Sequence, residues 1–183
     1  MLPFIELVPA NEREAFTKEV IRVSKSIGTR PEFLMYIMKH ESGISASVQN
    51  SIGATGLIQF MPQTAGALGY TTSQLKGMSR TEQLKVVEKY YYPYRFKNLS
   101  DFTNLSLVTF YPVAVGKPDS YIIGSEKSEA WAKKVSAQNK IFDLNKNGLI
   151  TIAEYREYLK KKFPDAFKLS TGFFLPDSSQ EKA

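Results

Sequence analysis

Apolar residues recur at helical spacing along most of this chain, and a glycine or a proline ends most of these runs. The first run carries Phe16, Val20, Ile21 and Val23 at helical spacing, and Gly28 follows it. The chain has no series of segments in which apolar and polar residues alternate, which is the pattern of half-buried strands. The sequence therefore predicts a mainly α-helical fold.

Residues with helix-capping side chains mark the expected starts of the first two helices. Asn11 followed by Glu14 predicts an N-cap, and Thr29 with Glu32 predicts a capping box. Gly43 is expected to close the second helix. A tight turn that leads into a packed helix is predicted for residues 53–69, and further helices for residues 79–93, 104–115, 128–138 and 151–163. The valine and phenylalanine content of residues 104–115 leaves a strand open there.

Composition places the chain among ordinary globular proteins. It has 183 residues, of which 43% are hydrophobic and 23% charged, enough for one domain with a small addition. The chain contains no cysteine and one histidine, His40, so zinc sites and nucleophilic triads are not expected. The net charge is +6, but the basic residues are spread along the chain, and no nucleic-acid partner is expected.

The ends of the chain and its apolar runs bear on where the protein acts. No apolar run is long enough to span a bilayer. The first residues, MLPFIELVPANERE, lack the basic region and long apolar stretch of a signal peptide. We expect either that a signal peptide was removed or that the protein leaves its cell by another route, within a virus particle or through cell lysis.

Glu41 occupies an unusual position for a carboxylate. It follows Leu34, Ile37 and Met38 at helical spacing and so continues the apolar stripe of its own helix. Burial and the negative end of the helix dipole both disfavour the charged form, so we expect a raised pKa and a proton available for general acid catalysis. Position alone fits equally well with a side chain that leans out into solvent.

The residues that follow Glu41 favour the catalytic role. Glu41-Ser42-Gly43 is followed by the segment GATGLIQFMP at residues 53–62 and then by Thr64-Ala65. These motifs closely resemble those of the soluble lytic transglycosylase and goose-type lysozyme superfamily, in which a glutamate opens the motif. The resemblance implies a lysozyme-like helical domain that cleaves the β-1,4 bond between N-acetylmuramic acid and N-acetylglucosamine, with Glu41 as the single general acid and base.

The resemblance leaves several outcomes open. In the transglycosylase branch the product is a 1,6-anhydromuramic end, and the acetamide of the substrate takes the place of a second carboxylate. No Asp or Glu lies between Glu41 and Glu82, which favours this branch. The alternatives are a hydrolytic goose-type lysozyme, and a virion structural protein that retains the fold without activity.

The resemblance also implies a set of substrate-binding residues, with two departures. Many relatives carry serine where this chain has Asn50, whose amide can still donate to an acetamide. The family's A-Y-N-A-G segment corresponds here to residues 110–114, FYPVA, which keep the tyrosine and replace the asparagine with proline. Tyr111 is expected to help position Glu41, or to be a tyrosine of the core. The expected substrate-binding residues are Ser42, Asn50, Gln59, Met61 and Tyr111.

A second motif lies near the C-terminus. Residues 143–154, DLNKNGLITIAE, match the twelve-residue EF-hand calcium loop, with Gly148 at the sharp turn. The alternative is a metal-free turn that caps the last helix. Because only one loop is present, we expect Ca²⁺ to have a structural role and catalysis to need no cofactor. The expected ligands are Asp143, Asn145, Asn147, Leu149 through its carbonyl, Thr151 and Glu154.

These motifs define the expected organisation. Residues 11–138 are predicted to form the lysozyme-like catalytic domain, residues 139–168 a C-terminal EF-hand-like segment packed on it, and residues 169–183 a poorly ordered tail. The expected partners are peptidoglycan glycan strands, with other virion or cell-wall proteins as further candidates. The protein is expected to act in the cell wall or periplasm, as a secreted enzyme or as a virion-associated phage lysin.

Overall fold

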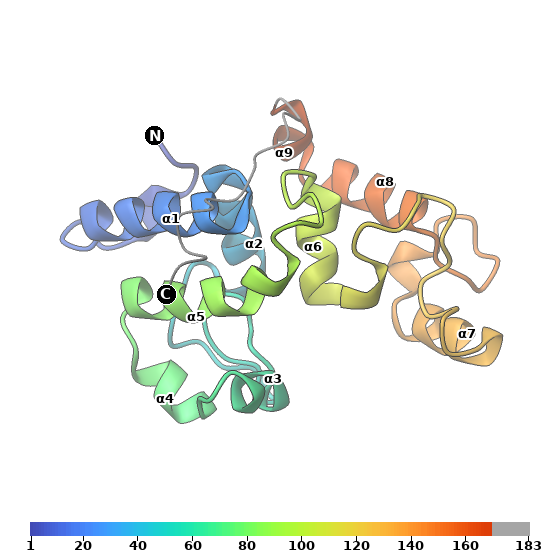
Figure 1. Cartoon of the computed structure of the whole chain (residues 1–183), viewed down its shortest axis with the longest axis horizontal. Coiled ribbons are helices and arrows are strands. Elements are labelled where there is room, and N and C mark those ends of the chain that lie inside the picture. The colour runs from blue at the N-terminus through green and yellow to red at the C-terminus, as the bar shows by residue number, and fades with distance from the viewer. Residues whose placement is uncertain (170–183) are drawn as a thin grey trace. The chain divides into compact units, whose positions relative to one another are not determined.

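The computed structural model describes residues 1–169, which form two compact units (Figure 1). The chain passes from the first unit to the second between Ser100 and Asp101. In the described part of the chain the regular elements are α-helices and short 3-10 turns. This part contains isolated β-bridges but no strands. The predicted mainly α-helical fold is confirmed. Of the predicted tail, residues 170–183 lie outside the described residues, and the predicted boundary at residue 138 stays a prediction.

The first unit is built on three long helices. These are α1 (Arg13–Ile27), α2 (Pro31–Ser42) and α5 (Arg80–Tyr91), and α1 lies against both α2 and α5. Their facing sides bury Val20 and Val23 of α1, Leu34 of α2, and Leu84 of α5, as the helical spacing predicts. Ile21, which the sequence places in the same run, is 50% exposed because it lies on the outer face of α1. Shorter elements complete the unit: the 3-10 turns Ile5–Leu7 and Tyr92–Tyr94, α3 (Pro62–Ala67) and α4 (Thr72–Gly77).

The predicted caps of α1 and α2 are wrong, whereas the predicted stops are confirmed. Glu12, rather than Asn11, is the N-cap of α1, and its side chain makes no capping hydrogen bond. Thr29 does not cap α2, because its buried hydroxyl donates to the carbonyl of Leu99 at 2.6 Å. A tertiary hydrogen bond has thus replaced the local one. Gly43 ends α2 with the left-handed torsion that this position favours.

The second unit contains α6 (Phe102–Phe110), α7 (Glu129–Gln138), α8 (Ile152–Lys162) and α9 (Pro164–Lys168), with 3-10 turns at Pro112–Ala114 and Lys140–Phe142. The segment for which a strand was left open is therefore a helix. It ends at Phe110 rather than near residue 115, because Pro112 disfavours the helical conformation at Tyr111, whose φ is −151° and ψ 82°. Phe110 stacks on Tyr155 of α8 with ring centroids 4.9 Å apart, and Phe142 packs edge-on against both rings.

Candidate functional site

Glu41 lies in the last turn of α2, half-buried, beside the fully buried Met38. The backbone then turns sharply, because Gly43 and Ile44 both adopt left-handed torsions, with φ of 64° and 63°. Such a torsion is strained for a β-branched residue like Ile44. Arg80 stabilises the turn by donating from Nε to the Ile44 carbonyl at 2.8 Å. The strain therefore lies three residues from the candidate acid, and functional sites are where such strain tends to cluster.

Ser42 joins the end of α2 to the motif that follows it. Its Oγ lies 2.9 Å from the carbonyl oxygen of Leu57 and 3.1 Å from that of Met38, and it accepts from the Ser45 amide at 3.1 Å. The hydroxyl has one proton, so it donates to one of these carbonyls at a time. These contacts give Ser42 a role in holding the loop, and its predicted contact with substrate stays a prediction.

The glycine-rich motif forms a tight hairpin in which Thr55 and Phe60 exchange both backbone hydrogen bonds. Gln83 of α5, fully buried, supports it: its Oε1 accepts from the Leu57 amide at 2.6 Å, and its Nε2 donates to the Ala46 carbonyl at 2.9 Å. A Cβ on Gly56 would lie 2.2 Å from Gln83 Oε1. The motif therefore needs glycine at residue 56 because the Gln83 amide fills that space.

Gln59 is half-buried at the end of this hairpin turn, and its φ of 55° is left-handed. Its Nε2 donates to the carbonyls of Gly56 at 3.1 Å and of Val48 at 3.4 Å. These bonds use only the amino side of the amide, so Oε1 retains its capacity to accept a hydrogen bond. Gln59 thus presents a fixed acceptor, the kind of group that the N–H of an acetamide would bind.

Asn50 and Met61 lie on the exposed side of the same loop. Asn50 Oδ1 accepts from the amides of Ile52 and Ala54, both at 3.0 Å, and this turn leaves its Nδ2 as a donor. Met61 is 42% exposed and precedes Pro62, the first residue of α3. Five candidate residues therefore lie either at the end of α2 or on the loop that Ser42 and Gln83 support: Glu41, Ser42, Asn50, Gln59 and Met61.

Tyr90 is a site residue that the sequence did not single out. Its phenol is close enough to the Glu41 carboxylate for an electrostatic interaction, and its ring packs edge-on against Phe60 at 6.0 Å. Burial, followed by the Tyr94 phenol and the Glu41 carboxylate, raises the pKa of Tyr90 to about 12, so it stays protonated. Its neighbour Tyr91 is fully buried in the core, and no sequence pattern distinguished Tyr90.

Tyr90 and Tyr94 also line a pocket of about 360 Å³ between α3 and the end of α5. Its other walls are Gln63, Thr64, Ala67, Leu68, Lys89 and Pro93. The volume is within the range of small-molecule sites, and the lining combines aromatic rings with hydroxyl and amide groups. Tyr90 therefore lines this pocket and also interacts electrostatically with Glu41.

Tyr111 belongs to the second unit and is half-buried there rather than part of its core. Its hydroxyl donates to Glu126 at 2.5 Å and accepts from the Trp131 indole at 3.1 Å. The predicted role of Tyr111 in positioning Glu41 stays a prediction.

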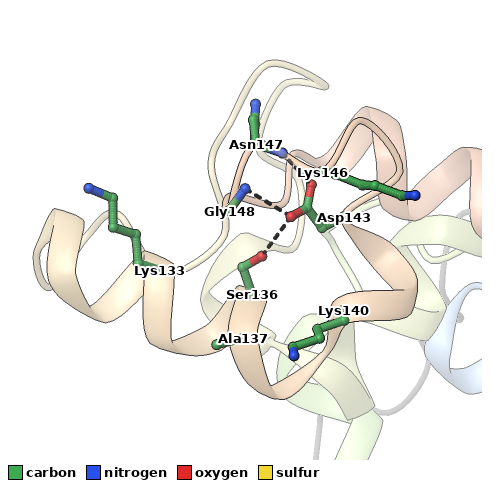
Figure 2. Close-up of a pocket in the computed structure, with 8 residues that line it drawn as sticks. All are labelled: Lys133, Ser136, Ala137, Lys140, Asp143, Lys146, Asn147 and Gly148. Carbon is green, nitrogen blue, oxygen red and sulfur yellow. Dashed lines mark hydrogen bonds between the residues drawn. The ribbon is translucent and has the colours of Figure 1, made fainter.

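The candidate calcium loop is held by hydrogen bonds to its own backbone. Figure 2 shows the Asp143 carboxylate between Ser136 of α7, whose Oγ lies 3.3 Å away, and the Gly148 amide, which donates at 2.9 Å. Lys146 and Gly148 have left-handed torsions, with φ of 61° and 83°. Glu154 accepts from the amide and the hydroxyl of Thr151 and so caps α8. Glu154 therefore has the helix-capping role that the alternative interpretation of the loop predicts.

The donor atoms of this loop fit a hard cation. Asp143, Asn145, Asn147 and Glu154 all supply side-chain oxygens, which Ca²⁺ prefers. Residues 1–169 contain no group of three or more His, Cys, Asp or Glu side chains that could hold a metal ion. The loop itself has two carboxylates, Asp143 and Glu154, so its other candidate ligands are amide, hydroxyl and carbonyl oxygens. Lys133 and Lys146 border the adjoining pocket, and in Figure 2 their side chains extend away from the Asp143 carboxylate. The low formal charge indicates modest affinity.

The loop is also paired with a second segment of its unit. The Ile123 amide donates to the Ile150 carbonyl at 2.8 Å, and the Ile152 amide donates to the Tyr121 carbonyl at 3.1 Å. A bridge between Ile122 and Thr151 lies between these bonds. The connection that carries Tyr121 therefore supports the C-terminal part of the loop.

A match to a known family covers the segment that carries the first of these two sites. Comparison with curated proteins and with solved structures gives no match. No helix in residues 1–169 is both long enough and apolar enough to cross a membrane. Residues 20–89 match the family model described as the Transglycosylase SLT domain. This segment, which contains Glu41 and the Gln59 hairpin, therefore supports a place in the lysozyme-like superfamily and a general function as a peptidoglycan-degrading transglycosylase.

Proposed function

We propose that this protein is a peptidoglycan lytic transglycosylase with Glu41 as its only general acid and base. The observation that carries the proposal is the position of Glu41, half-buried at the end of α2, electrostatically coupled to Tyr90 and followed by the strained turn at Ile44. The family match over residues 20–89 supports the substrate class.

The proposed reaction moves two protons, the first from Glu41 to the leaving group and the second from the substrate back to Glu41. Glu41 donates its proton to the glycosidic oxygen between N-acetylmuramic acid and N-acetylglucosamine, and the C1–O bond breaks. The acetamide oxygen of the muramic acid bonds to C1 and carries the developing charge. The Glu41 carboxylate then removes the proton of the C6 hydroxyl, whose oxygen attacks C1 and displaces the acetamide. The 1,6-anhydro product forms without water, and Glu41 regains its proton.

The engagement of other carboxylates supports a mechanism with one acid. In the first unit, Glu12 pairs with Arg80, and Glu19 and Glu88 both pair with Arg22. The bonds from Ser79 lower the pKa of Glu82, which caps α5. These four carboxylates take part in structural contacts, whereas a partner acid would have to exchange a proton with substrate.

Digestion of purified peptidoglycan by the wild type, by Glu41→Gln and by Glu32→Gln tests this proposal. Glu32 lies in the first turn of the same helix, so its variant makes the same chemical change away from the site. We expect wild-type activity from Glu32→Gln and a loss of at least about a hundredfold from Glu41→Gln, because proton transfer contributes at least that factor. A wild type that releases no fragments would leave the virion structural protein as the alternative.

We also propose that residues 143–154 bind Ca²⁺ as a structural staple of the second unit. Asp143, Asn145, Asn147, Thr151 and Glu154 would supply side-chain oxygens, and Leu149 its carbonyl. The bound ion would neutralise Asp143 and Glu154 and fix the start of α8. Catalysis would use no cofactor. The site of action we propose is the cell wall or periplasm, reached by secretion or on a virion as a phage lysin, with other virion or wall proteins as partners.

A further inference from the structure

The pocket that Tyr90 lines adjoins a second pocket on α5, and both belong to the first unit. The second pocket has a volume of about 350 Å³, close to the 360 Å³ of the first. Its walls are Lys85, Glu88, Lys89, Tyr92 and Pro93. Because Lys89 and Pro93 line both pockets, the two form one continuous surface, here called the α5 groove.

Lys89 is a cation held in place where the two pockets meet. Its Nζ donates to the carbonyl of Leu68 at 2.7 Å and lies 5.6 Å from the centre of the Tyr70 ring. An ammonium group has three N–H donors, so two remain for another molecule. The contact with Leu68 also restricts the long side chain, which lowers the entropic cost of binding to it.

The charges of the α5 groove favour an anionic ligand. Within residues 1–169, neither Lys85 nor Lys89 forms a salt bridge. The one carboxylate of the groove, Glu88, already accepts from two guanidinium nitrogens of Arg22, at 3.1 Å and 2.5 Å. The groove therefore presents two lysines to a ligand, and the charge of its carboxylate is offset by Arg22.

The neutral groups of the α5 groove suit a peptide. Gln63 and Thr64 supply an amide and a hydroxyl, each of which can both donate and accept a hydrogen bond, as a backbone requires. Tyr90 and Tyr94 supply phenols, and burial raises the pKa of Tyr90 to about 12, so its hydroxyl remains a donor at neutral pH. These groups, together with the lysines, would recognise a short peptide that carries carboxylates.

The spacing of the lysines favours a peptide over a single small acid. Lys85 and Lys89 lie about one helical turn apart on α5, which is a rise of about 6 Å. An extended peptide advances about 3.4 Å per residue, so carboxylates two residues apart would reach both ammonium groups. In peptidoglycan the lactyl group of muramic acid carries a short acidic peptide. The lactyl group alone is too short to extend from one lysine to the other.

We propose that the α5 groove binds the acidic peptide stem of muramic acid and gives the protein a preference for glycan strands that still carry their peptides. The identity of the polymer rests on the proposed function. Lys89 and Lys85 would bind carboxylates of the stem. They determine specificity and take no part in proton transfer.

The test measures binding by the full chain with Glu41→Gln, so that no ligand is consumed. Calorimetry gives the Kd for soluble, uncross-linked peptidoglycan strands, and for the same strands after an amidase has removed their peptides. We expect the peptide-bearing strands to bind about fivefold more tightly, the scale of an exposed ion pair. Raised salt should reduce this preference, because both lysines are exposed.

Three variants on the same background locate the preference. Lys89→Met keeps the apolar part of the side chain and removes its charge, so the preference should disappear. Lys89→Arg restores a cation and should restore the preference. Lys76→Met removes an exposed lysine from α4, outside the α5 groove, and should leave it unchanged. Equal melting temperatures would show that all three variants remain folded.

Two outcomes overturn the inference: equal Kd values for the two kinds of strand, or a preference that survives Lys89→Met. A loss of affinity in Lys89→Met that is the same for both strands would also overturn it, because the ligand would then be the lactyl carboxylate or the sugar. Wall digestion tests the proposed function separately. A preference for peptides in a protein that releases no wall fragments would retain the groove and lose the enzyme, and digestion without the preference would do the reverse.

Discussion

Ile44 and Gln59 hold left-handed backbone torsions although neither is glycine, and they lie on either side of the loop that follows Glu41. Each conformation costs on the order of 1–2 kcal/mol, which the surrounding contacts must offset. Arg80 binds the Ile44 carbonyl, and Gln83 binds the hairpin beside Gln59. At the scale of single residues, the site is thus held by two side chains of α5 that do not belong to the catalytic motif.

Gln83 provides the sharpest test of this support. Gln83→Leu fills a similar volume but removes the partners of the Leu57 amide and of the Ala46 carbonyl. We expect a loss of about 2–4 kcal/mol in the free energy of unfolding, because buried backbone groups are left without partners. Chemical denaturation measures it, with Gln138→Leu, an exposed change on α7, as the control. Equal stability of the two variants would show that Gln83 does not hold the hairpin.

Tyr90 is expected to act through Glu41. Tyr90→Phe keeps the ring that packs on Phe60 and removes the hydroxyl that interacts electrostatically with the Glu41 carboxylate. We expect an unchanged melting temperature, a rate of wall cleavage about tenfold lower, and a shifted pH profile, because the acid loses a polar neighbour. Tyr70→Phe, at a half-buried tyrosine near Lys89, is the control. A rate and a pH profile like those of the wild type would remove Tyr90 from the site.

At the scale of elements, the long amphipathic helices were predictable and the short ones were not. α1, α2 and α5 each present an apolar stripe that reaches the core, and Gly28 and Gly43 end two of them. α4 and α9 span fewer than two helical turns, too few for a periodic pattern. Thr29 bonds to Leu99, seventy residues away along the chain, and no local signal encodes such a contact.

The same limit applies to the candidate site. The motif indicated Glu41 and Gln59 because their spacing from neighbouring residues is fixed. Gln83 and Tyr90 come from a helix whose sequence pattern marks only its buried stripe, so their contacts with the motif emerged from packing. The raised pKa expected for Glu41 and the substrate contacts of Ser42, Asn50 and Met61 stay predictions.

The calcium loop is expected to influence the elements to which it is bonded. Ile150 pairs with Ile123, and a Cβ on the next residue, Gly124, would lie 3.2 Å from Trp131 Cδ1. Removal of Ca²⁺ by a chelator should therefore lower the melting temperature and alter Trp131 emission, and added Ca²⁺ should restore both. Asp143→Asn, which loses one of the two charges, should respond only at higher Ca²⁺ concentration. A wild type that is indifferent to chelator would reject the calcium proposal.

At the scale of the molecule, the two units carry separate evidence. The family match lies within the first unit, where Glu41, Gln59 and Tyr90 are found. The candidate calcium loop lies in the second unit, which that match does not reach. The function of the whole chain therefore depends on whether the first unit performs the chemistry that its segment indicates.

Mass spectrometry of peptidoglycan digested by the wild type and by Glu41→Gln tests that chemistry most directly. We predict fragments with 1,6-anhydromuramic ends from the wild type, each lighter by one water than the hydrolysis product, and almost none from the variant. Reducing ends from the wild type would show a hydrolase of the goose-type class instead. Undiminished cleavage by Glu41→Gln would contradict the central claim that Glu41 is the catalytic acid.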